Sequence, residues 1–518
     1  MTQAPAHKFK VTYSTLSSPD PELHRLYDEA VTDFRRHAGQ TYPMFINGQE
    51  RFAEQTFAKI SPVDTDLVMG YFQKGTEKDA NDAVAAAKAA YPGWRDMPWQ
   101  ERVAILRRAA DLLSDRLFKM GAVMSLEVGK NRLEALGDVE ETADLIRYNC
   151  DAMEKNNGFA KPLLTESDRH HNRSVLKPYG VWVVISPFNF PGALAGGPSG
   201  AALAAGNTVV FKPATDTPFT GWLLTEAFRD AGVPAGVFNL INGDGPGVGA
   251  PLSAHPGVDM MSFTGSTRAG ILVAKAAAET VKRVSQELGG KSANIILDDA
   301  DLVKAVGGSV QGLMINSGQS CNAGTRMFVP AAKHDEALAI AAAAANATKA
   351  GDPFAEGTNI GPVVNKSQYE KIQALIEKGI KEGATLAAGG LGRPEGVNKG
   401  YFVRPTVFGN VTNDMTIARE EIFGPVLSIL PYKSEAEAIE MANDTVYGLS
   451  GYVQSGSIDH ARAVAKQLRT GNVHLNLAGP DLKAPFGGYK QSGNGREWGE
   501  FGFHDFLEVK AVLGYEAA

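Results

Sequence analysis

The chain has 518 residues and a formal net charge of −7, with 44% hydrophobic and 21% charged residues, the balance of a globular protein with more than one domain. This charge, the lack of a basic run and the lack of an apolar stretch of about 20 residues favour neither nucleic acid nor a membrane as partner. Two cysteines, Cys150 and Cys321, are too few for a disulfide framework or a zinc site, so we expect no metal and a reducing, cytoplasmic location.

The first 130 residues combine an arm, a hairpin and helices. Residues 1–40 are charged and mostly aperiodic, which predicts a peripheral arm. Asn47 and Gly48 in "YPMFINGQE" predict a hairpin turn between short strands. Thr76 and Asp79 have capping-box spacing and predict the start of a helix. A longer amphipathic helix then directs four apolar side chains toward a core: Val103, Leu106, Leu113 and Leu117.

Short apolar runs dominate the middle of the chain. The runs "GVWVVISPF", "NTVVFKP", "GVFNLI" and "VDMMSFTG" alternate with helix-length segments, which predicts parallel strands buried on both faces. A second set begins with "ANIILDD" and "TRMFVP", so we expect an α/β fold with two domains that divide near residue 290. The Ala-rich "EALAIAAAAANATKAG" predicts a helix that ends at Gly351. The tail "DFLEVKAVLGY" predicts a strand that can extend a neighbouring subunit's sheet.

Three polar residues occur where chemistry can take place. Asn189 in "SPFNFP" follows a strand, where its amide can donate to a developing oxyanion or simply form a turn. Lys212 ends a buried strand, in the crevice where open α/β sheets bind ligands; a lysine that snorkels out of the sheet is the alternative. Glu287 in "SQELGGKS" fits a general base or a surface carboxylate at a helix C-terminus.

Glycines cluster after two successive strands. Such turns let the backbone approach a phosphate at a helix N-terminus, although βα turns are often glycine-rich and the G-x-G-x-x-G placement is not met. The two clusters comprise Gly243, Gly245 and Gly249, then Gly265, Ser266 and Gly270.

Cys321 lies among small polar residues in "MINSGQSCNAG". Apolar neighbours would indicate a buried hydrophobe, and further Cys or His residues would indicate a metal ligand. The observed neighbours favour an accessible nucleophile whose thiolate helix amides can stabilise. Cys150, in the helical "LIRYNCDAMEK", is expected to serve packing.

Together these stretches resemble the aldehyde dehydrogenase superfamily over about residues 40–515. Seven motifs occur in family order: "ISPFNFP", "GNTVVFKPA", "FTGSTRAG", "ELGGKS", "NSGQSCNAGTR", "EEIFGPV" and "PFGGYKQSGNGRE". The resemblance implies a Rossmann-type cofactor domain, an α/β catalytic domain and a small β oligomerisation element that forms a homodimer or homotetramer. The expected ranges are an arm at 1–40, the dinucleotide-binding domain at 41–155 and 179–290, the oligomerisation element at 156–178 and 500–518, and the catalytic domain at 291–499.

The resemblance also implies NAD(P)-dependent oxidation of an aldehyde to the carboxylic acid. Cys321 would attack the aldehyde, and the Asn189 amide and the Cys321 N–H would hold the alkoxide of the thiohemiacetal. Hydride transfer to the nicotinamide would leave a thioester, which water activated by Glu287 would hydrolyse. The spacing of 34 positions from Glu287 to Cys321 matches the family, and Glu497 corresponds to a proton-relay carboxylate of some members.

The cofactor roles follow from the same resemblance. Lys212 would contact the adenosine ribose, Ser266 the pyrophosphate and Glu421 the nicotinamide ribose, with Phe423 beside the ring. Thr215 stands where many NAD-preferring members carry a glutamate, so we expect NAD with NADP tolerated. The expected cofactor-binding set is completed by Ser186, Phe188, Gly245, Gly249 and Gly265.

The sequence stretches point to more than one class of aldehyde substrate. The stretches "YPMFING" and "DVEETADLIRYNC" are similar to bacterial dehydrogenases of glutamate semialdehyde, but Asn322 after the cysteine and the loop with Asp481 depart from that branch. A general aromatic or aliphatic aldehyde is therefore preferred, with glutamate semialdehyde as the alternative. A CoA-acylating enzyme and an inactive scaffold are less favoured, because Glu287 is retained together with Cys321 and Asn189.

Overall fold

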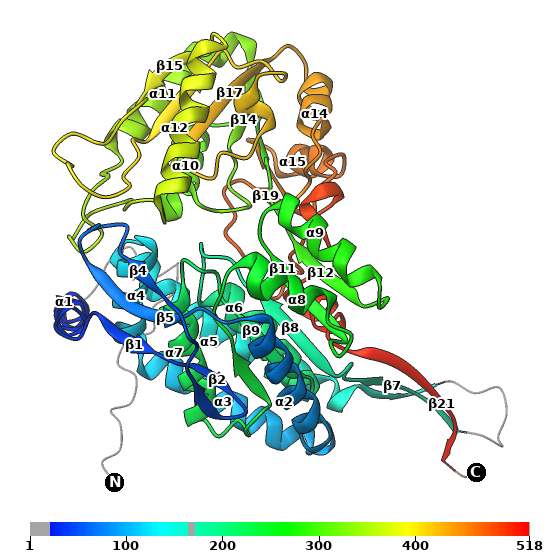
Figure 1. Cartoon of the computed structure of the whole chain (residues 1–518). Coiled ribbons are helices and arrows are strands. Elements are labelled where there is room, and N and C mark those ends of the chain that lie inside the picture. The colour runs from blue at the N-terminus through cyan, green and yellow to red at the C-terminus, as the bar shows by residue number, and fades with distance from the viewer. Residues whose placement is uncertain (1–20, 164–170, 517–518) are drawn as a thin grey trace.

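The computed structural model describes residues 21–163 and 171–516, which form two α/β lobes and a projecting β-ribbon (Figure 1). An eight-stranded sheet with the order β20-β12-β11-β8-β9-β10-β2-β3 forms the centre of the first lobe. Its strands are β2 (Met44–Ile46), β3 (Gln49–Arg51), β8 (Val181–Ile185), β9 (Thr208–Lys212), β10 (Phe238–Leu240), β11 (Met260–Thr264), β12 (Arg283–Glu287) and β20 (Gly493–Asn494).

The second lobe is built on a seven-stranded sheet with the order β15-β16-β17-β14-β13-β18-β19. Its strands are β13 (Ala293–Ile296), β14 (Arg326–Pro330), β15 (Thr385–Ala388), β16 (Thr406–Gly409), β17 (Val426–Tyr432), β18 (Ser450–Gln454) and β19 (Asn472–Leu475). Two three-stranded sheets complete the fold: β1 (Gln40–Tyr42), β5 (Val68–Gln73) and β4 (Thr56–Ile60), and β21 (Glu508–Glu516), β7 (His171–Lys177) and β6 (Ala160–Pro162).

Helices cover both large sheets. The first lobe carries α1 (Pro21–Arg36), α2 (Glu77–Asp96), α3 (Trp99–Asp115), α4 (Leu117–Val128), α5 (Arg132–Lys155), α6 (Ala193–Ala205), α7 (Pro218–Asp230), α8 (Ala250–Ala254), α9 (Thr267–Ala278) and α16 (Gly499–His504). The second lobe carries α10 (Leu302–Met314), α11 (His334–Ala347), α12 (Lys366–Lys381), α13 (Thr416–Arg419), α14 (Glu435–Asn443) and α15 (Ile458–Ala465). None of the helices in the described ranges combines the length and the apolar character needed to cross a bilayer.

The parallel strands predicted from the apolar runs are confirmed. The four predicted runs contain β8 to β11, which pair in parallel. Strand β12 pairs in parallel with β11 but has the polar sequence RVSQE and was not predicted. Alternate residues of β8 enter different cores. Trp182 and Val184 join one hydrophobic cluster, whereas Val181 and Val183 join another on the opposite face. Burial on both faces explains why these strands read as unbroken apolar runs.

The division of the large sheets near residue 290 is also confirmed, because β12 ends the parallel set of the first sheet and β13 lies in the second. One late segment differs from this simple order. Residues 493–494 return to the first sheet as β20, which pairs antiparallel with Gln286 and Glu287. The C-terminal part of the chain therefore reaches the end of β12.

Local turn and cap chemistry follows the sequence. Asn47 and Gly48 have φ values of 55° and 72° and join β2 to β3, as the type I′ turn requires. Thr76 and Asp79 form the predicted capping box of α2. The predicted C-terminal strand is β21, which pairs antiparallel with β7.

Three sequence-based expectations are wrong in detail. Residues 21–36 are not an aperiodic arm but the helix α1, which buries Leu23, Tyr27 and Val31; residues 1–20 lie outside the described residues. The predicted amphipathic helix is divided at Arg116, so that Leu117 begins α4. The Ala-rich helix α11 ends at Ala347 and not at Gly351, because Thr348 already has extended backbone angles.

Candidate active site

Cys321 lies in a turn between α10 and β14, and the residue is partly exposed. The expected helix amides are absent: the turn follows a short 3-10 segment, and the backbone amides of Cys321 and Asn322 are the groups that favour the thiolate. Burial and the negative charges of Glu421 and Glu287 outweigh them and raise the pKa of the thiol. The sulfur is therefore a protonated thiol near neutral pH, and a nearby base is needed to activate it.

Glu287 is the last residue of β12 and is 3% exposed, so it is not a surface residue at a helix end. Neither carboxylate oxygen has a hydrogen-bond partner within the described residues. Burial and the neighbouring charge of Glu497 raise the pKa of Glu287 well above 4.5, while Arg496 acts in the opposite direction. A buried carboxylate with unused acceptors and a raised pKa has the properties of a general base.

Two glycines bring the parts of this site together. A Cβ at Gly290 would stand 2.3 Å from the Cys321 carbonyl oxygen, and one at Gly289 would stand 2.7 Å from Oε2 of Glu421. The amide of Gly290 donates to Oε1 of Glu421 at 2.8 Å. The "GG" after Glu287 is therefore needed because the backbone here touches both the cysteine turn and a second carboxylate, the half-buried Glu421, whose pKa desolvation raises.

Asn189 is 2% exposed, and its Nδ2 donates to the carbonyl oxygen of Gln319 at 3.1 Å. The side-chain amide of Asn316 donates to the Asn189 carbonyl at 2.7 Å. These bonds fix Asn189 against the segment that precedes Cys321. The structure thus brings Asn189, Cys321 and Glu287 to one place from three distant parts of the chain.

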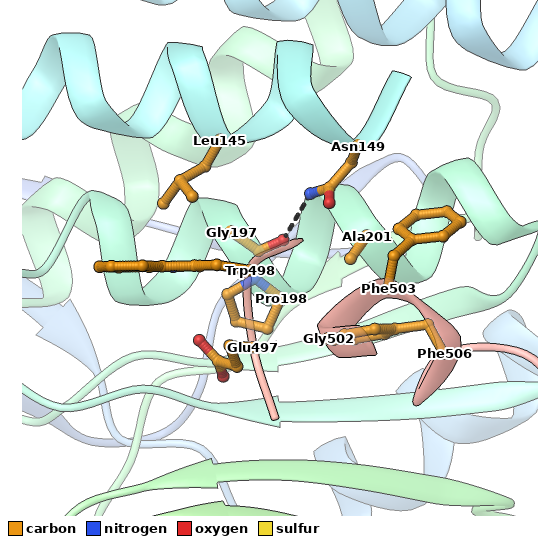
Figure 2. Close-up of a pocket in the computed structure, with 10 residues that line it drawn as sticks. All are labelled: Leu145, Asn149, Gly197, Pro198, Ala201, Glu497, Trp498, Gly502, Phe503 and Phe506. Atoms are coloured by element: carbon orange, nitrogen blue, oxygen red, sulfur yellow. Dashed lines mark hydrogen bonds between the residues drawn. The ribbon is translucent and has the colours of Figure 1, made fainter. Parts of the chain in front are cut away.

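Glu497 lines a small pocket beside Glu287 (Figure 2). Burial and the charge of Asp505 raise the pKa of Glu497 to about 7. Within this pocket the amide of Asn149 donates to the Gly197 carbonyl at 3.2 Å. The remaining lining comes from α5, α6 and the segment around α16: Leu145, Pro198, Ala201, Trp498, Gly502, Phe503 and Phe506.

A second group of predicted residues lies at the carboxyl end of β9. Lys212 is 4% exposed and does not snorkel; its Nζ donates to the Pro213 carbonyl at 3.1 Å, and burial lowers its pKa to about 8. The Ser186 amide donates to the Lys212 carbonyl, and Thr215 Oγ1 donates to the Gly243 carbonyl. Gly249 faces Lys212, since a Cβ there would meet its Cε at 3.9 Å.

The two glycine turns have different electrostatics. Ser266 caps α9, and its hydroxyl accepts from the Ala269 amide at 3.3 Å. Gly265 donates its amide to the carbonyl of Glu287 at 3.0 Å, which places this turn beside the general base candidate. Gly245 instead follows Asp244, whose carboxylate already accepts from the Gly247 amide. A carboxylate at that turn disfavours a phosphate, whereas the serine-capped turn is neutral.

Phe188 of the first lobe and Phe423 of the second lobe contact each other at the site. Their rings form an edge-to-face pair with centroids 5.8 Å apart and planes at 89°. Phe423 has a φ of 60°, an uncommon conformation for a bulky residue. The next residue, Gly424, lies against the segment that precedes Cys321, since a Cβ at Gly318 would stand 2.2 Å from the Gly424 carbonyl oxygen.

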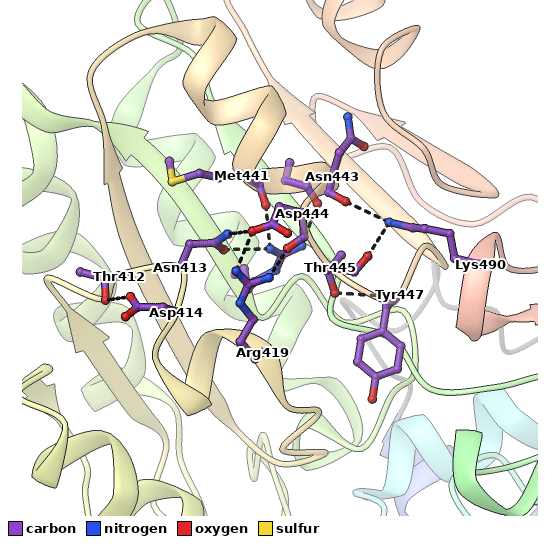
Figure 3. Close-up of polar contacts among 12 residues, drawn as sticks. Thr412, Asn413, Asp414, Arg419, Met441, Asn443, Asp444, Thr445, Tyr447 and Lys490 are labelled. Carbon is purple, nitrogen blue, oxygen red and sulfur yellow. Dashed lines mark hydrogen bonds and ion pairs between the residues drawn. The ribbon is translucent and has the colours of Figure 1, made fainter.

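A polar network outside the site anchors the segments that carry its residues (Figure 3). Arg419, two residues before Glu421, donates to the backbone carbonyl and the carboxylate of Asp444 at 2.6 Å each. Lys490 donates to the carbonyls of Asn443 and Thr445. Arg326, five residues after Cys321, donates to the carbonyls of Met441 and Ala442. These cations cap the C-terminal end of α14 and fix three site segments to one helix.

Cys150 does not join the site. It is fully buried in α5, and burial raises the pKa of its thiol to about 12. Sequence reasoning missed Glu134, Lys291 and Gly487, all of which contact site segments or lie in them. Lys291 is 1% exposed with a pKa lowered by burial to about 7. A Cβ at Gly487 would stand 2.7 Å from Oε1 of Glu287.

Comparison with known proteins agrees with this site. The sequence profile of the aldehyde dehydrogenase family matches residues 49–512. The chain is 51% identical over 455 residues to a 3-succinoylsemialdehyde-pyridine dehydrogenase from a Pseudomonas species, covering 88% of this chain and 94% of that protein.

Solved structures agree in fold as well. A mutant of aldehyde dehydrogenase C from Pseudomonas syringae, in complex with NAD+ and octanal, superposes with a TM-score of 0.89 at 42% identity, covering 93% of this chain and 98% of that one. The NAD+ complex of betaine aldehyde dehydrogenase from Staphylococcus aureus superposes with a TM-score of 0.90 at 33% identity, covering 94% and 97% of the two chains. The chain therefore belongs to the aldehyde dehydrogenase family, and the activity of that family is the NAD(P)-dependent oxidation of an aldehyde.

Proposed function

We propose that Cys321 is the nucleophile of this aldehyde dehydrogenase and that Glu287 is its general base. The observation that carries the proposal is the pairing of these two groups. Glu287 is buried, neither of its carboxylate oxygens has a hydrogen-bond partner in the part of the chain that the structure describes, and its charge raises the pKa of the Cys321 thiol. The thiol keeps its proton until attack, and a base with free acceptors and a raised pKa of its own can take that proton at that moment.

Attack of the Cys321 sulfur on the aldehyde carbon forms a C–S bond and the alkoxide of the thiohemiacetal. One N–H of the Asn189 side chain is used by the Gln319 carbonyl, and the other is available for this alkoxide together with the Cys321 amide. Departure of the hydrogen on the same carbon as a hydride, with the electron pair that NAD would accept when bound, leaves a thioester on Cys321. Once Glu287 has passed on the thiol proton, it removes a proton from the attacking water. The C–S bond then breaks, the carboxylic acid leaves, and the Cys321 sulfur regains a proton.

Glu497 is the proposed next acceptor for that proton. Its pKa of about 7 and its proximity to Glu287 allow it to exchange a proton near neutral pH. Asp505 keeps this pKa raised through its own charge. Glu287 thus interacts with Glu497, and Glu497 with Asp505, which supports a proton relay through these carboxyl groups.

The residues around β9 and α9 fit NAD, which accepts the hydride when bound. The amine of Lys212 is buried and makes one bond, to its neighbour's carbonyl, so it retains two N–H donors for ribose oxygens. Ser266 caps a 12-residue helix whose N-terminus suits a pyrophosphate. Asp244 makes the Gly245 turn less suitable, so the phosphates are assigned to Ser266 and Gly265. Thr215 adds no negative charge, which leaves NADP tolerated.

The remaining assignments concern Glu421 and the aromatic pair. Glu421 is held by the Gly290 amide through Oε1 and is assigned to the nicotinamide ribose. Phe188 and Phe423 would limit the movement of the nicotinamide ring beside them. Ser186 supports Lys212 through its backbone bond.

The substrate is proposed to be an aldehyde with an apolar aliphatic or aromatic body. The related Pseudomonas protein is named for a pyridine-bearing semialdehyde, and the structural neighbour was solved with octanal. The loop before "PFGG" carries Asp481, whose charge would repel the carboxylate of an amino-acid semialdehyde. No finding favours glutamate semialdehyde.

A homo-oligomer in the cytoplasm completes the proposal. Strand β21 projects from the body with β7 (Figure 1) and exposes 66% of Val509 and 73% of Leu513. Both cysteines are free thiols, as a reducing compartment maintains them. The proposed domains are a dinucleotide-binding domain at 41–155 and 179–290, an oligomerisation element at 156–178 and 500–518, and a catalytic domain at 291–499.

Cofactor reduction with a panel of aldehydes and either NAD or NADP tests the function. Cys321→Ser is expected to lower turnover at least about a thousandfold, because a hydroxyl is a far weaker nucleophile than a thiolate. The matched control Cys150→Ser should retain turnover within about twofold. Equal losses in the two variants would refute the assignment of the nucleophile.

A further inference from the structure

The segment before Cys321 has an unusual backbone. Asn316, Ser317 and Gly318 have φ values of 53°, 56° and 72°, three successive residues in the left-handed region. Glycine adopts this conformation readily, but Asn and especially Ser do so at a cost. Such a segment persists only where its surroundings hold it.

One carboxylate from the first lobe holds the start of this segment. Oε1 of Glu134 accepts from the Asn316 amide at 3.1 Å. Glu134 is 8% exposed and is the third residue of α5, where the side chain of the helix cap, Asn131, accepts from its own amide at 2.9 Å. Its second oxygen, Oε2, has no hydrogen-bond partner within the described residues.

The first turns of α5 and the residues before them also hold the Asn189 segment. Lys130 is 1% exposed, and its Nζ lies 3.7 Å from the ring centroid of Phe190 and 3.5 Å from Oδ2 of Asp138. Oδ1 of Asp138 accepts from the Ala193 amide at 2.9 Å. Burial raises the pKa of the Glu134 carboxyl. The positive charge of Lys130 partly offsets this effect, and the resulting pKa is about 7.

We propose that Glu134 is a positioning residue that sets the orientation of Cys321 and Asn189 by fixing the Asn316 amide. The connection is short. Glu134 holds Asn316, and the Asn316 side chain donates to the carbonyls of Asn189 and Gln319. Gln319 is two residues before Cys321 and accepts the Asn189 amide. The hydrogen bonds of Glu134 run to Asn131 and to the Asn316 amide and not to Cys321, so it acts through this backbone.

This inference rests on the proposed role of Cys321 and makes a prediction that separates geometry from charge. Glu134→Gln keeps an acceptor oxygen at the same distance from the helix backbone but removes the negative charge. Glu134→Asp keeps the charge but shortens the side chain by one methylene, so that the carboxylate no longer reaches the Asn316 amide. If positioning is the role, the shorter side chain is the damaging one. A misplacement of about 1 Å at a reacting group costs roughly ten- to a hundredfold in rate.

The test is the rate at which iodoacetamide alkylates Cys321, measured with kcat and the KM for NAD on the full chain. Glu134→Asp should slow alkylation and lower kcat about tenfold or more, with the KM for NAD within about twofold. Glu134→Gln should stay within about threefold of the unmodified protein.

Glu140 provides a matched control on the same helix. It is 5% exposed and accepts from Ser114 Oγ at 3.0 Å, away from the cysteine segment. Glu140→Asp should lower the melting temperature about as much as Glu134→Asp without slowing alkylation. The inference would be overturned if Glu134→Asp were alkylated as fast as the unmodified protein. It would also be overturned if Glu140→Asp slowed alkylation as much as Glu134→Asp does. Cys321→Ser measured in parallel separates the two proposals, because retained turnover there would overturn the nucleophile and not the positioning contact alone.

Discussion

Gly487 lies directly against the carboxylate of Glu287: a Cβ at this glycine would stand 2.7 Å from Oε1. The contact joins the "PFGG" segment near the C-terminus to the end of β12. The backbone of Gly487 thus forms one wall of the space in which the base must turn toward water.

Gly487→Ala is expected to displace Glu287 and slow hydrolysis of the thioester more than its formation. A contact this short forces a shift of the carboxylate, and a shift of about 1 Å lowers the rate roughly ten- to a hundredfold. Intact-protein mass spectrometry during turnover should show the acylated enzyme accumulating. Gly479→Ala, in the same segment but with open space around the added carbon, is the control, and equal behaviour of the two variants would contradict the prediction.

The pH dependence of turnover should respond to Glu497. Glu287 must be ionised to act as a base, so turnover rises with pH through the raised pKa of Glu287. Glu497→Gln removes one of the charges that raise this pKa, so the acid limb of the profile should move to lower pH. Glu500→Gln is the control, because Glu500 is exposed and pairs with Lys155. An unchanged acid limb in Glu497→Gln would show that the two carboxylates do not interact.

The stability of the protein should reveal the cost of ionising Glu287. Its pKa is higher in the folded protein than the ordinary value of 4.5, so the folded state binds the proton more tightly than the unfolded chain. The folded state therefore loses stability as pH rises from about 4.5 through the raised pKa.

Glu287→Gln removes this ionisation and should raise the melting temperature by roughly 1–3 °C at about pH 8. The difference should shrink toward about pH 5, where the native carboxyl is protonated and neutral like the amide. Scanning calorimetry across this pH range measures it. A variant that is less stable than the unmodified protein at high pH would mean that the carboxylate has partners that compensate its burial.

The sequence predicted the apolar parallel strands and supplied the candidate site residues because their signals are local. Lys212 ends an apolar strand, Glu287 precedes two glycines between apolar segments, and Cys321 has small polar neighbours, so each could be recognised within a few residues. The family motifs then supplied roles for them. The same locality explains the errors: the end of α11 depends on where Thr348 becomes extended, a packing outcome that helix propensity does not contain.

Long-range contacts could not be predicted in this way. The contact between Glu134 and the Asn316 amide spans 182 positions, and nothing next to Glu134 in the sequence points to it. The sequence shows the two glycines after Glu287 but not why glycine is required there. The reason lies in the structure, where Cys321 and Glu421 pack directly against them. Residues whose role depends on a partner from a distant segment give no pattern that a single sequence can show.

The cofactor preference should depend on Thr215. Its hydroxyl donates to the Gly243 carbonyl near Lys212 and adds no charge. Thr215→Glu should lower kcat/KM with NADP at least about tenfold, because a carboxylate within a few ångström repels a 2′-phosphate. The value with NAD should change by less than about threefold. Thr215→Gln, which has the same size without the charge, should leave NADP use intact; an equal loss there would assign the effect to volume.

The assembly should depend on the exposed face of β21. Val509 and Leu513 are four positions apart on β21, with 66% and 73% of their surfaces exposed, and an apolar strand of this kind is favourable only if another surface covers it. The double change Val509→Asp and Leu513→Asp should therefore shift the protein to monomers, as measured by light scattering after gel filtration. Lys510→Glu changes the charge on the alternate side of the strand and should leave the assembly intact. An unchanged mass in the double variant would exclude β21 from the subunit contact, and dissociation by Lys510→Glu alone would point to the opposite side of the strand.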